Sequence, residues 1–377
     1  MENILISGGA GFIGSNLALK LVSLGHKVTI LDNLSPQIHT ESENNSQLYL
    51  SIKDKVFFIK GDVRNRKDWQ KAIANNSVIV HLAAETGTGQ SMYQIEKYVE
   101  VNCSGTAIML DILANEEHQV KKVVVASSRA IYGEGKYQCS DHGDVYPSER
   151  TDEQMSKGHF EPICTKCKQS VALVSTDENS KIHPTSIYGI TKSNQEQMIL
   201  VACKSLGISA VSLRYQNVYG PGQSLSNPYT GILSIFSTRI LNNNPINIFE
   251  DGQESRDFVF IDDVVDATVL AIQNNTIESD SFNVGSGVST TVQTVADGLK
   301  RLYQSDVEIH VSGNYRLGDI RHNKADISKI KQTLGFTPKV PFEEGLKQFV
   351  DWVKRQDVNS DNYDHSISEM KDKGLMK

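Results

Sequence analysis

A glycine cluster near the start of the chain limits its fold more than any other feature. The glycines of residues 8–14 have the spacing G-x-x-G-x-x-G, directly after the apolar run 4–6 and before a helical pattern over 16–24. Glycines between a strand and a helix let the backbone approach a pyrophosphate, which the helix N-terminus then stabilises. The glycine spacing is weak evidence alone, but both flanking elements are present. The segment predicts a dinucleotide site; a glycine-rich turn without a ligand is the alternative.

Apolar runs and helical patterns alternate through the first half of the chain. After residues 4–6, the runs lie at 28–31, 56–59, 78–82, 123–126 and 209–213. They are continuous and rich in β-branched residues, which is typical of strands that are covered on both faces. Repeated strand-helix-strand units connect parallel strands by right-handed crossovers. The sequence therefore predicts an α/β protein with a Rossmann-type doubly wound parallel sheet.

The pattern changes along the chain and suggests a division into parts. Residues 1–214 form the predicted dinucleotide-binding domain, which is interrupted at about 135–184 by an insertion rich in Cys, His, Gly, Asp and Ser. The elements of 215–354 are shorter and mixed, so we expect a smaller α/β domain there, with the chain free to cross between the two domains. Residues 355–377 are polar, and we expect a frayed tail.

An acidic residue selects between the two common nicotinamide dinucleotides. Asp32 ends the second apolar run, about twenty residues after the glycines, where a carboxylate accepts hydrogen bonds from the ribose hydroxyls of NAD and repels a 2′-phosphate. No arginine follows it directly, which favours NAD over NADP; an ordinary turn aspartate is the alternative. Asp62, after the third run, is a second candidate and is placed to contact adenine.

A tyrosine and a lysine in the spacing Y-x-x-x-K form the predicted catalytic pair. On a helix, Tyr188 and Lys192 lie on one face. An unperturbed tyrosine has a pKa of about 10. A nearby ammonium and the positive ring of NAD⁺ lower that pKa, which makes the phenol a usable base. Ser128 follows the run 123–126, at the strand end where open α/β sheets bind ligands, and can donate a hydrogen bond to the reacting oxygen. A chance Y-x-x-x-K helix is the alternative, but the order and distance from the glycines favour a site.

Composition excludes several classes of protein. The net charge of −7 disfavours a broad nucleic-acid binder. No apolar run approaches the roughly 18 residues of a membrane-spanning helix, and the N-terminus has no basic segment typical of a signal peptide. Five cysteines do not form a disulfide framework in a chain of this length. We therefore expect a cytoplasmic protein with no membrane and no nucleic-acid partner.

Together these motifs resemble the extended short-chain dehydrogenase/reductase family, in particular its NAD-dependent nucleotide-sugar epimerases and dehydratases. The resemblance spans nearly the whole chain except the insertion and the tail. Besides the glycines, Asp32 and the Tyr188–Lys192 pair, it rests on residues 61–63, 81–84, 127–128, 132–133, 214–222, 256–264, 283–285, Arg316, Gly318 and Asp319.

The resemblance implies roles for individual residues. Tyr188 would be the base, Lys192 its electrostatic partner and Ser128 the donor to the substrate oxygen. The implied NAD-binding residues are Gly8, Gly11, Phe12, Ile13, Gly14, Asp32, Asn33, Asp62, Val63, Leu82, Ala83, Ala84, Asn102, Tyr188, Lys192 and Tyr215. The implied residues for a nucleotide-diphosphate sugar are Thr86, Ser128, Arg129, Asn217, Arg256, Arg316 and Asp319, of which Arg256 and Arg316 would clamp the diphosphate. The family commonly dimerises through a helix pair, so a homodimer is expected.

The two residues that directly follow Ser128 indicate which reaction of the family this chain catalyses. A 4,6-dehydratase of the family carries an Asp-Glu pair there to eliminate water, whereas this chain has Arg129 and Ala130. The resemblance therefore favours a 4-epimerase, which oxidises C4 transiently and returns hydride to the opposite face. A dehydratase or an oxidoreductase of the same family is the alternative. An NAD-sensing binding protein would be expected to have lost Tyr188 or Lys192. Arg129 contacts either the sugar or the diphosphate, or turns away into a salt bridge.

The insertion carries a candidate zinc site. Cys139 and His142 form C-x-x-H, and Cys164 and Cys167 form C-x-x-C, a spacing typical of structural zinc with four closed positions. His159 or His183 is the alternative fourth ligand, and unrelated thiols or a disulfide are the alternative to metal. Together with residues 128–135 and 223–229, the insertion resembles a subgroup of the family that includes the dTDP-L-rhamnose 4-epimerases.

Overall fold

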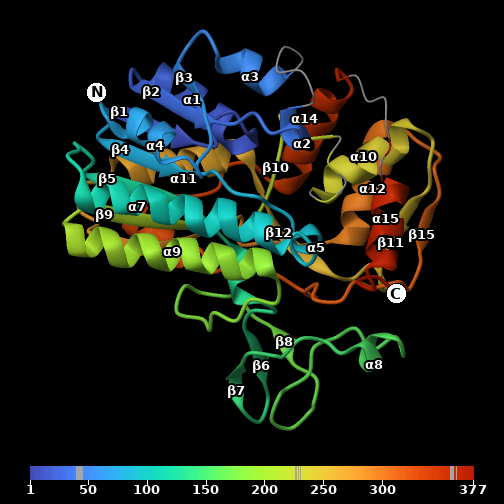
Figure 1. The fold of residues 1–377 in the computed structure, drawn as a ribbon. Helices are drawn as coiled ribbons and strands as arrows, with labels where there is room; N and C mark the ends of the chain where they lie inside the picture. Colours follow the sequence, from blue (N-terminus) through green and yellow to red (C-terminus); the bar gives the residue numbers. More distant parts are fainter. Residues whose placement is uncertain (40–45, 226, 228, 230, 357–360, 362) are drawn as a thin grey trace.

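A seven-stranded parallel sheet forms the centre of the molecule (Figure 1). The computed structural model describes residues 1–39, 46–225, 227, 229, 231–356, 361 and 363–377. In spatial order the strands are β3 (Phe57–Lys60), β2 (Lys27–Asp32), β1 (Asn3–Ser7), β4 (Val78–His81), β5 (Lys122–Ser128), β9 (Ser209–Tyr215) and β13 (Ser279–Val284). This order confirms the predicted doubly wound Rossmann-type sheet.

Each strand of the sheet contributes to two cores, which explains the continuous apolar runs. In β1, Ile4 and Ile6 belong to the larger core, whereas Leu5 belongs to the smaller one. All three side chains are fully buried. Because successive side chains point to opposite faces, a sheet covered on both sides requires apolar residues at consecutive positions.

Helices cover both faces of the sheet and connect its strands. Those packed with the smaller core include α4 (Arg66–Ile73), α7 (Gly105–Asn115) and α9 (Ile187–Leu206); α1 (Phe12–Ser23) and α11 (Ile261–Gln273) pack with the larger core. Short helices between them are α2 (Pro36–His39), α3 (Gln47–Ile52), α5 (Thr88–Ser91), α6 (Ile95–Tyr98), the π-helical turn η2 (Val99–Ser104) and the 3₁₀ turn η3 (Arg129–Tyr132).

A smaller mixed region lies beside the sheet. It contains the strands β10 (Asn217–Tyr219), β12 (Ser255–Phe260) and β14 (Ser289–Thr291), the pair β11 (Ile246–Ile248) and β15 (Ile309–Val311), and the helices α10 (Ile232–Leu241), α12 (Val292–Tyr303), α13 (Ser328–Leu334) and α14 (Phe342–Val353). Strand β13 returns from this region to the edge of the central sheet. The chain therefore crosses between the two parts, while the division at residue 214 stays a prediction.

The 135–184 insertion projects away from the body of the molecule (Figure 1). Its elements are β6 (Tyr137–Cys139), β7 (Gly143–Val145), β8 (Ala172–Leu173) and the single-turn helix α8 (Asp152–Met155). Its small core consists of Tyr137, Val145 and two cysteines, Cys139 and Cys164. Such a core is too small to hold the insertion together alone.

The expectation of a frayed C-terminal tail is wrong. Residues Tyr363–Asp372 form helix α15, in which Tyr363, Ser366 and Met370 are buried. Tyr363, Ile367 and Met370 lie on one side at the spacing i, i+4, i+7, and this apolar stripe docks the helix despite its polar composition. Residues 357–360 and 362 of the tail, like Ser226 and Pro228 of the segment 223–229, lie outside the described residues.

No helix in the described parts of the chain combines the length and the hydrophobicity that a membrane crossing requires.

Candidate active site

A cavity of about 560 Å³ lies where the carboxyl ends of the sheet strands face the smaller region. This volume falls within the range of small-molecule sites, about 300–1,000 Å³. The predicted cofactor and substrate residues line it with two exceptions, Asp62 and Asn102. Residues at the ends of β2, β5 and β9, and the residues directly after β1 and β4, line one side, which is the edge at which open α/β sheets bind ligands.

The glycine loop forms one end of this cavity. Glycine is required there because a larger residue would clash with the neighbouring backbone. Gly8 has φ +69°, and a Cβ on it would lie 2.7 Å from the amide nitrogen of Ala83. A Cβ on Gly14 would lie 2.5 Å from the carbonyl oxygen of Gly8. The loop leads into α1, whose first turn carries no acidic residue and whose N-cap, Gly11, supplies no side chain. The helix N-terminus therefore offers its partial positive charge to an anion.

Asp32 supports the glycine loop from the end of β2. Its carboxylate accepts hydrogen bonds from the backbone nitrogens of Ala10 (2.9 Å) and Leu34 (2.8 Å). His39 Nε2 lies 3.9 Å from the same carboxylate. Burial raises the pKa of Asp32, and these amides and His39 oppose the shift. The residue is thus more than the turn aspartate considered as the alternative, since it ties β2 to the loop.

Two residues predicted to bind the cofactor support the cavity wall instead. Asp62 is held by Arg64, with Nη2 to Oδ2 at 2.9 Å, and by Asn33 at 3.2 Å. Asn102 is fully buried and bonds both the backbone nitrogen and the carbonyl oxygen of Glu85, at 2.8 and 3.1 Å. Both residues orient chain segments at the cavity, and contact of either residue with the cofactor stays a prediction.

Ser128 and Tyr188 line the cavity together, with their hydroxyl groups close enough to interact. The backbone nitrogen of Tyr188 also donates to Ser91 Oγ at 3.0 Å, which fixes the start of α9. Burial raises the pKa of Tyr188, while the hydrogen bond from Ser128 and the charge of Arg129 act to lower it. Arg129 is therefore one cation that acts on the phenol, and the role that the sequence suggests for Lys192 stays a prediction.

Lys192 is buried and directed to a glutamine one helical turn further on. Its Nζ donates to Gln195 Oε1 at 2.7 Å, and Gln195 Nε2 lies 3.0 Å from Thr106 Oγ1 and 3.3 Å from His81 Nε2. Burial lowers the pKa of Lys192 to about 7, and Glu196 opposes the shift. Sequence analysis missed Gln195; its i+3 spacing from Lys192 on one helix is the signal that would have found it.

Asp319 joins two of the predicted substrate arginines. Arg256 Nη2 lies 3.0 Å from one oxygen of its carboxylate, and Arg316 Nη2 lies 3.2 Å from the other. Burial raises the pKa of Asp319, but the guanidinium groups of Arg316, Arg256 and Arg129 outweigh this effect and hold it below its usual value. The carboxylate therefore stays ionised and fixes the two arginines at the cavity.

Several polar atoms at the cavity have no partner within the described part of the chain. The Arg129 guanidinium makes no hydrogen bond or ion pair to the described residues, so the salt bridge considered as one alternative is not formed. Burial lowers its pKa to about 10. The buried atoms Arg316 Nε and Asn217 Oδ1 also lack a hydrogen-bond partner among these residues. Unsatisfied buried groups that line a cavity indicate a polar ligand.

Helix α15 supplies part of the cavity wall that sequence analysis missed. Tyr363, Ser366, Ile367 and Met370 line the cavity, and Glu369 bonds Tyr229. The apolar spacing of α15 is the signal that would have found these residues, since it predicts a docked helix.

The four predicted metal ligands of the insertion converge. His142 Nδ1 lies 3.6 Å from the sulfurs of Cys139 and Cys164, and the sulfurs of Cys139 and Cys167 are also 3.6 Å apart. The corners of a tetrahedral zinc site with Zn–S of about 2.3 Å and Zn–N of about 2.0 Å lie about 3.5–3.8 Å apart. No disulfide joins the five cysteines. The donor set therefore fits zinc, and the alternatives His159 and His183 do not belong to the cluster found among the described residues.

Comparisons with known proteins agree with this geometry. The model of the "NAD dependent epimerase/dehydratase family" matches residues 4–174 and 166–285. A dTDP-L-rhamnose 4-epimerase from Burkholderia thailandensis is 35% identical over 358 residues, which cover 94% of this chain and 96% of that protein. The chain belongs to the NAD dependent epimerase/dehydratase family. Its predicted family and fold are thereby confirmed.

Two solved structures of epimerases are similar over most of the chain. One is the UDP-glucose 4-epimerase of Thermotoga maritima with UDP-glucose, with a TM-score of 0.75, 29% identity and coverage of 94% of this chain and 99% of that one. The other is the Thermus thermophilus UDP-glucose 4-epimerase in complex with NAD, with a TM-score of 0.72, 27% identity and the same coverages. The family match ends at residue 285, before Arg316 and Asp319. The family match therefore does not cover these two predicted substrate residues.

Proposed function

We propose that the protein is an NAD-dependent nucleotide-sugar 4-epimerase. The observation that supports this best is that one cavity is lined by the glycine loop, by Ser128 and Tyr188, and by the two arginines that Asp319 holds. A dinucleotide and a diphosphate-bearing sugar can meet between them. The relatives named above are 4-epimerases that use this class of substrate.

Tyr188 acts first as base and later as acid in this proposal. Its oxygen takes the proton of the sugar 4-hydroxyl, while Ser128 Oγ holds that hydroxyl in place. NAD⁺, when bound, would supply the acceptor for the hydride of C4 and would return that hydride to the other face of the sugar. Arg129 and Lys192 stabilise the phenolate, which offsets the effect of burial on the pKa of Tyr188. After the sugar has turned, Tyr188 gives the proton back to the oxygen at C4.

The cofactor side of the cavity suits NAD. The helix N-terminus after Gly11 binds the pyrophosphate, and Asp32 accepts hydrogen bonds from the ribose hydroxyls. Both roles follow the prediction of NAD over NADP. On the substrate side, Arg316 Nε and Asn217 Oδ1 are the unsatisfied groups that a nucleoside diphosphate sugar would engage. Thr86, Arg129, Arg256 and Asp319 complete the proposed substrate set.

A product analysis tests this function against its nearest alternative. Purified protein with NAD is incubated with dTDP-, UDP-, GDP- and CDP-sugars, and the products are read by NMR. We expect inversion at C4 of one or a few substrates, dTDP-L-rhamnose among the first to be tried. Formation of a 4-keto-6-deoxy sugar would instead establish a dehydratase, although Arg129 and Ala130 replace the pair that elimination needs. Binding of NAD without turnover of any sugar would favour an NAD-sensing protein.

We also propose that the Cys139–His142–Cys164–Cys167 cluster binds a structural zinc ion. Backbone hydrogen bonds from Cys167 and Lys166 help to lower the pKa of Cys164 to about 6, which favours the thiolate that metal requires. Four protein ligands leave no open position for catalysis. Metal analysis of the purified protein is expected to give about one zinc per chain. Protein without zinc and with three reactive cluster thiols would contradict the site.

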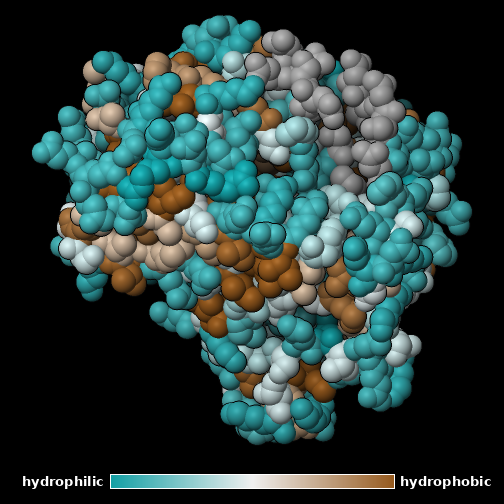
Figure 2. Space-filling view, viewed as in Figure 1, coloured by the Kyte–Doolittle hydropathy of each residue, from teal (hydrophilic) through white to brown (hydrophobic). Residues whose placement is uncertain are grey.

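A homodimer in the cytoplasm remains the proposed setting. Val201 and Ile190 on α9 are 72% and 43% exposed, and Figure 2 shows hydrophobic side chains where α7 and α9 lie in Figure 1. A second copy of this helix face would cover them. The unpaired cysteines fit a reducing compartment. Light scattering of wild type and Val201→Glu tests the dimer, since the variant is expected to be monomeric.

A further inference from the structure

The insertion carries charged residues that contact the substrate side of the cavity. The cluster ligands Cys139 and His142 precede the stretch 143–163, and Cys164 follows it. The ends of this stretch therefore meet at the cluster, so that it forms a closed loop. Arg150, Phe160 and Glu161 lie in this loop and reach the segment 315–326, which carries Arg316 and Asp319.

Arg150 is the central contact between the two. It is buried, and its Nη1 lies 2.8 Å from both carboxylate oxygens of Glu250. Its Nε lies 3.2 Å from Glu134 Oε1, and its Nη2 donates to the carbonyl oxygen of Asp319 at 3.0 Å. One side chain of the insertion thus binds the backbone of the very residue whose carboxylate holds Arg256 and Arg316.

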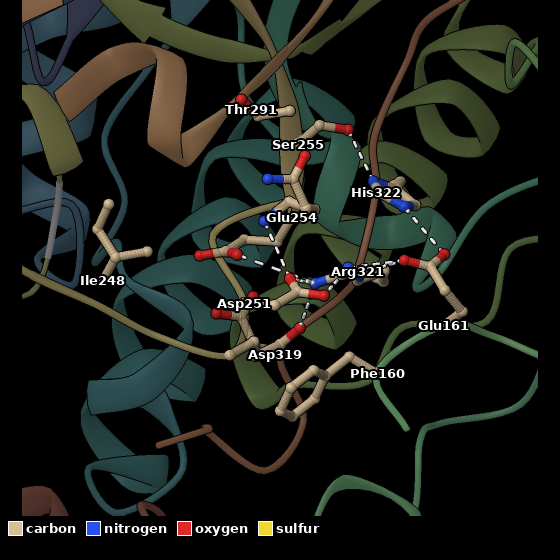
Figure 3. A network of polar contacts seen from close by, with 12 residues as sticks. Phe160, Glu161, Ile248, Asp251, Glu254, Ser255, Thr291, Asp319, Arg321 and His322 are labelled. Carbon is tan, nitrogen blue, oxygen red and sulfur yellow. Dashed lines mark hydrogen bonds and ion pairs between the residues drawn. The ribbon is translucent and has the colours of Figure 1, made fainter. Parts of the chain in front are cut away.

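Arg321 makes the matching contact from the segment 315–326. Figure 3 shows its guanidinium between the carboxylates of Asp251 and Glu161. The Nε–Oε1 distance to Glu161 is 2.7 Å, and Asp251 is 2.8 and 2.9 Å away. Its backbone nitrogen donates to Glu134 Oε2 at 2.9 Å. Arg321 is only 1% exposed, whereas Glu161 and Asp251 are about half exposed, so the buried guanidinium depends on these two carboxylates.

The remaining contacts between the insertion and the segment 315–326 lie at the two ends of that segment. Tyr315 packs against Met155 and Phe160 and donates to Asp152 Oδ1 at 2.6 Å. At the other end, the backbone of Thr176 pairs with the chain at 324–326, at 2.8 and 2.9 Å. The insertion therefore holds the segment before, at and after the residues that line the cavity.

We propose that the insertion is a clamp that positions the anion-binding arginines, with Arg150 as its central positioning residue. This inference rests on the proposed function, because the ligand of Arg256 and Arg316 is taken to be the diphosphate of a nucleotide sugar. A preorganised pair of guanidinium groups binds without first losing conformational freedom. The cofactor side, which is built on the central sheet, does not depend on the clamp.

The test compares Arg150→Met with the matched control Lys157→Met in the full-length, metal-loaded protein. Lys157 lies in the same loop and forms an exposed i,i+4 ion pair with Glu153. Calorimetry measures the Kd of UDP, of dTDP and of NAD, and hydrogen exchange measures the protection of backbone amides in 315–326. We expect Arg150→Met to raise the Kd of the nucleoside diphosphate by about tenfold or more, the scale seen when groups that orient direct ligands are removed. The Kd of NAD stays within about twofold and the segment loses protection, while Lys157→Met changes neither.

Other variants keep the test decisive. Arg150→Lys restores one of the charge contacts and is expected to recover part of the affinity. If Arg150→Met does not fold, Glu161→Gln takes its place, and a chelator that removes metal from the wild type is expected to produce the same loss of protection in 315–326.

Each result has one reading. Unchanged protection of 315–326 in Arg150→Met overturns the clamp, and so does unchanged diphosphate affinity despite lost protection. An equal loss of NAD and diphosphate affinity shows general destabilisation and also overturns it. A wild type that binds neither UDP nor dTDP is also tested with GDP and CDP, and binding of none of the four contradicts the proposed function instead. Hydrogen exchange then still decides whether the insertion holds the segment.

Discussion

The two sides of the cavity are built in different ways. The main contacts of the cofactor side come from a short stretch of sequence, namely the backbone of the glycine loop and Asp32, which bonds two amides. The substrate side consists of long side chains from separate elements, among them Arg129, Arg256 and Arg316. They are held by Asp319 and, behind it, by the insertion. The first side depends on local geometry, whereas the second depends on charged groups that distant segments must keep in place.

Replacing Tyr188, which lies between the two sides, should have the largest effect. Tyr188→Phe removes only the phenol oxygen, so the fold and both binding sides stay intact. Turnover is expected to fall by about 10²–10⁴-fold, the usual contribution of a general acid-base group. The Kd values of NAD and of a nucleoside diphosphate should remain near those of the wild type. Near-normal turnover in a steady-state assay would remove Tyr188 from the chemistry.

Asp32→Ala should affect the cofactor side alone. The variant loses a charged acceptor for the ribose and the two amide contacts that support the loop. Hydrogen bonds to charged groups contribute about 1.5–3 kcal/mol, so NAD affinity should fall roughly ten- to hundredfold, with a smaller fall for NADP. Asp62→Ala is the control and should bind NAD almost normally, because the Asp62 carboxylate bonds Arg64 and Asn33. Calorimetry with both dinucleotides decides, and an unchanged NAD/NADP preference in Asp32→Ala would contradict the role.

Arg129→Met should change the pH dependence of turnover, which depends on the substrate side of the cavity. The positive charge of Arg129 acts to lower the pKa of Tyr188. Without it the phenol holds its proton to higher pH, so the acidic limb of the kcat profile should move to higher pH. Arg301→Met, which breaks an exposed ion pair with Glu343, should leave the profile in place. A shift to lower pH would show that Arg129 does not act on the phenol.

The smallest effect is expected at the exposed edge of the clamp. Hydrogen bonding to His322, together with Arg321, lowers the pKa of Glu161 to about 2 from its usual 4.5. A carboxyl group with a lowered pKa stabilises the folded protein fully above about pH 4.5, and this stabilisation is lost as the pH falls toward 2. The melting temperatures of wild type and Glu161→Gln should therefore differ by at most a few degrees near pH 6, and the difference should shrink on acidification. A difference that is constant from pH 6 to pH 3 would exclude an ionised Glu161 as its cause.

Much of the fold was predictable because its cause is local. The continuous apolar runs identified six of the seven sheet strands, since burial on both faces leaves a direct trace in consecutive residues. Strand β13 was not identified as part of this sheet, because its place depends on a return from the smaller region. Helix α15 was missed because overall polar composition concealed three apolar residues at helical spacing.

The candidate site divides in the same manner. Gly8, Gly14 and Asp32 carry their geometry in short motifs, so their position at the cavity followed from the residue types and spacing. The partner of Lys192 did not, because a buried ammonium takes the acceptor that packing offers, and here this is Gln195. Whether Arg129 forms an ion pair could also not be predicted, because the same motif fits a paired and a free guanidinium.

The amino-acid order was sufficient for a parallel sheet, a glycine loop, a Tyr-Lys pair and a cluster of three cysteines and one histidine, because each is defined by residue types at short spacing. Which charges meet across the substrate side was settled by packing. Arg150 and Asp319 are 169 residues apart, and their contact exists because the folded chain buries Arg150, whose guanidinium must then find its acceptors within the protein.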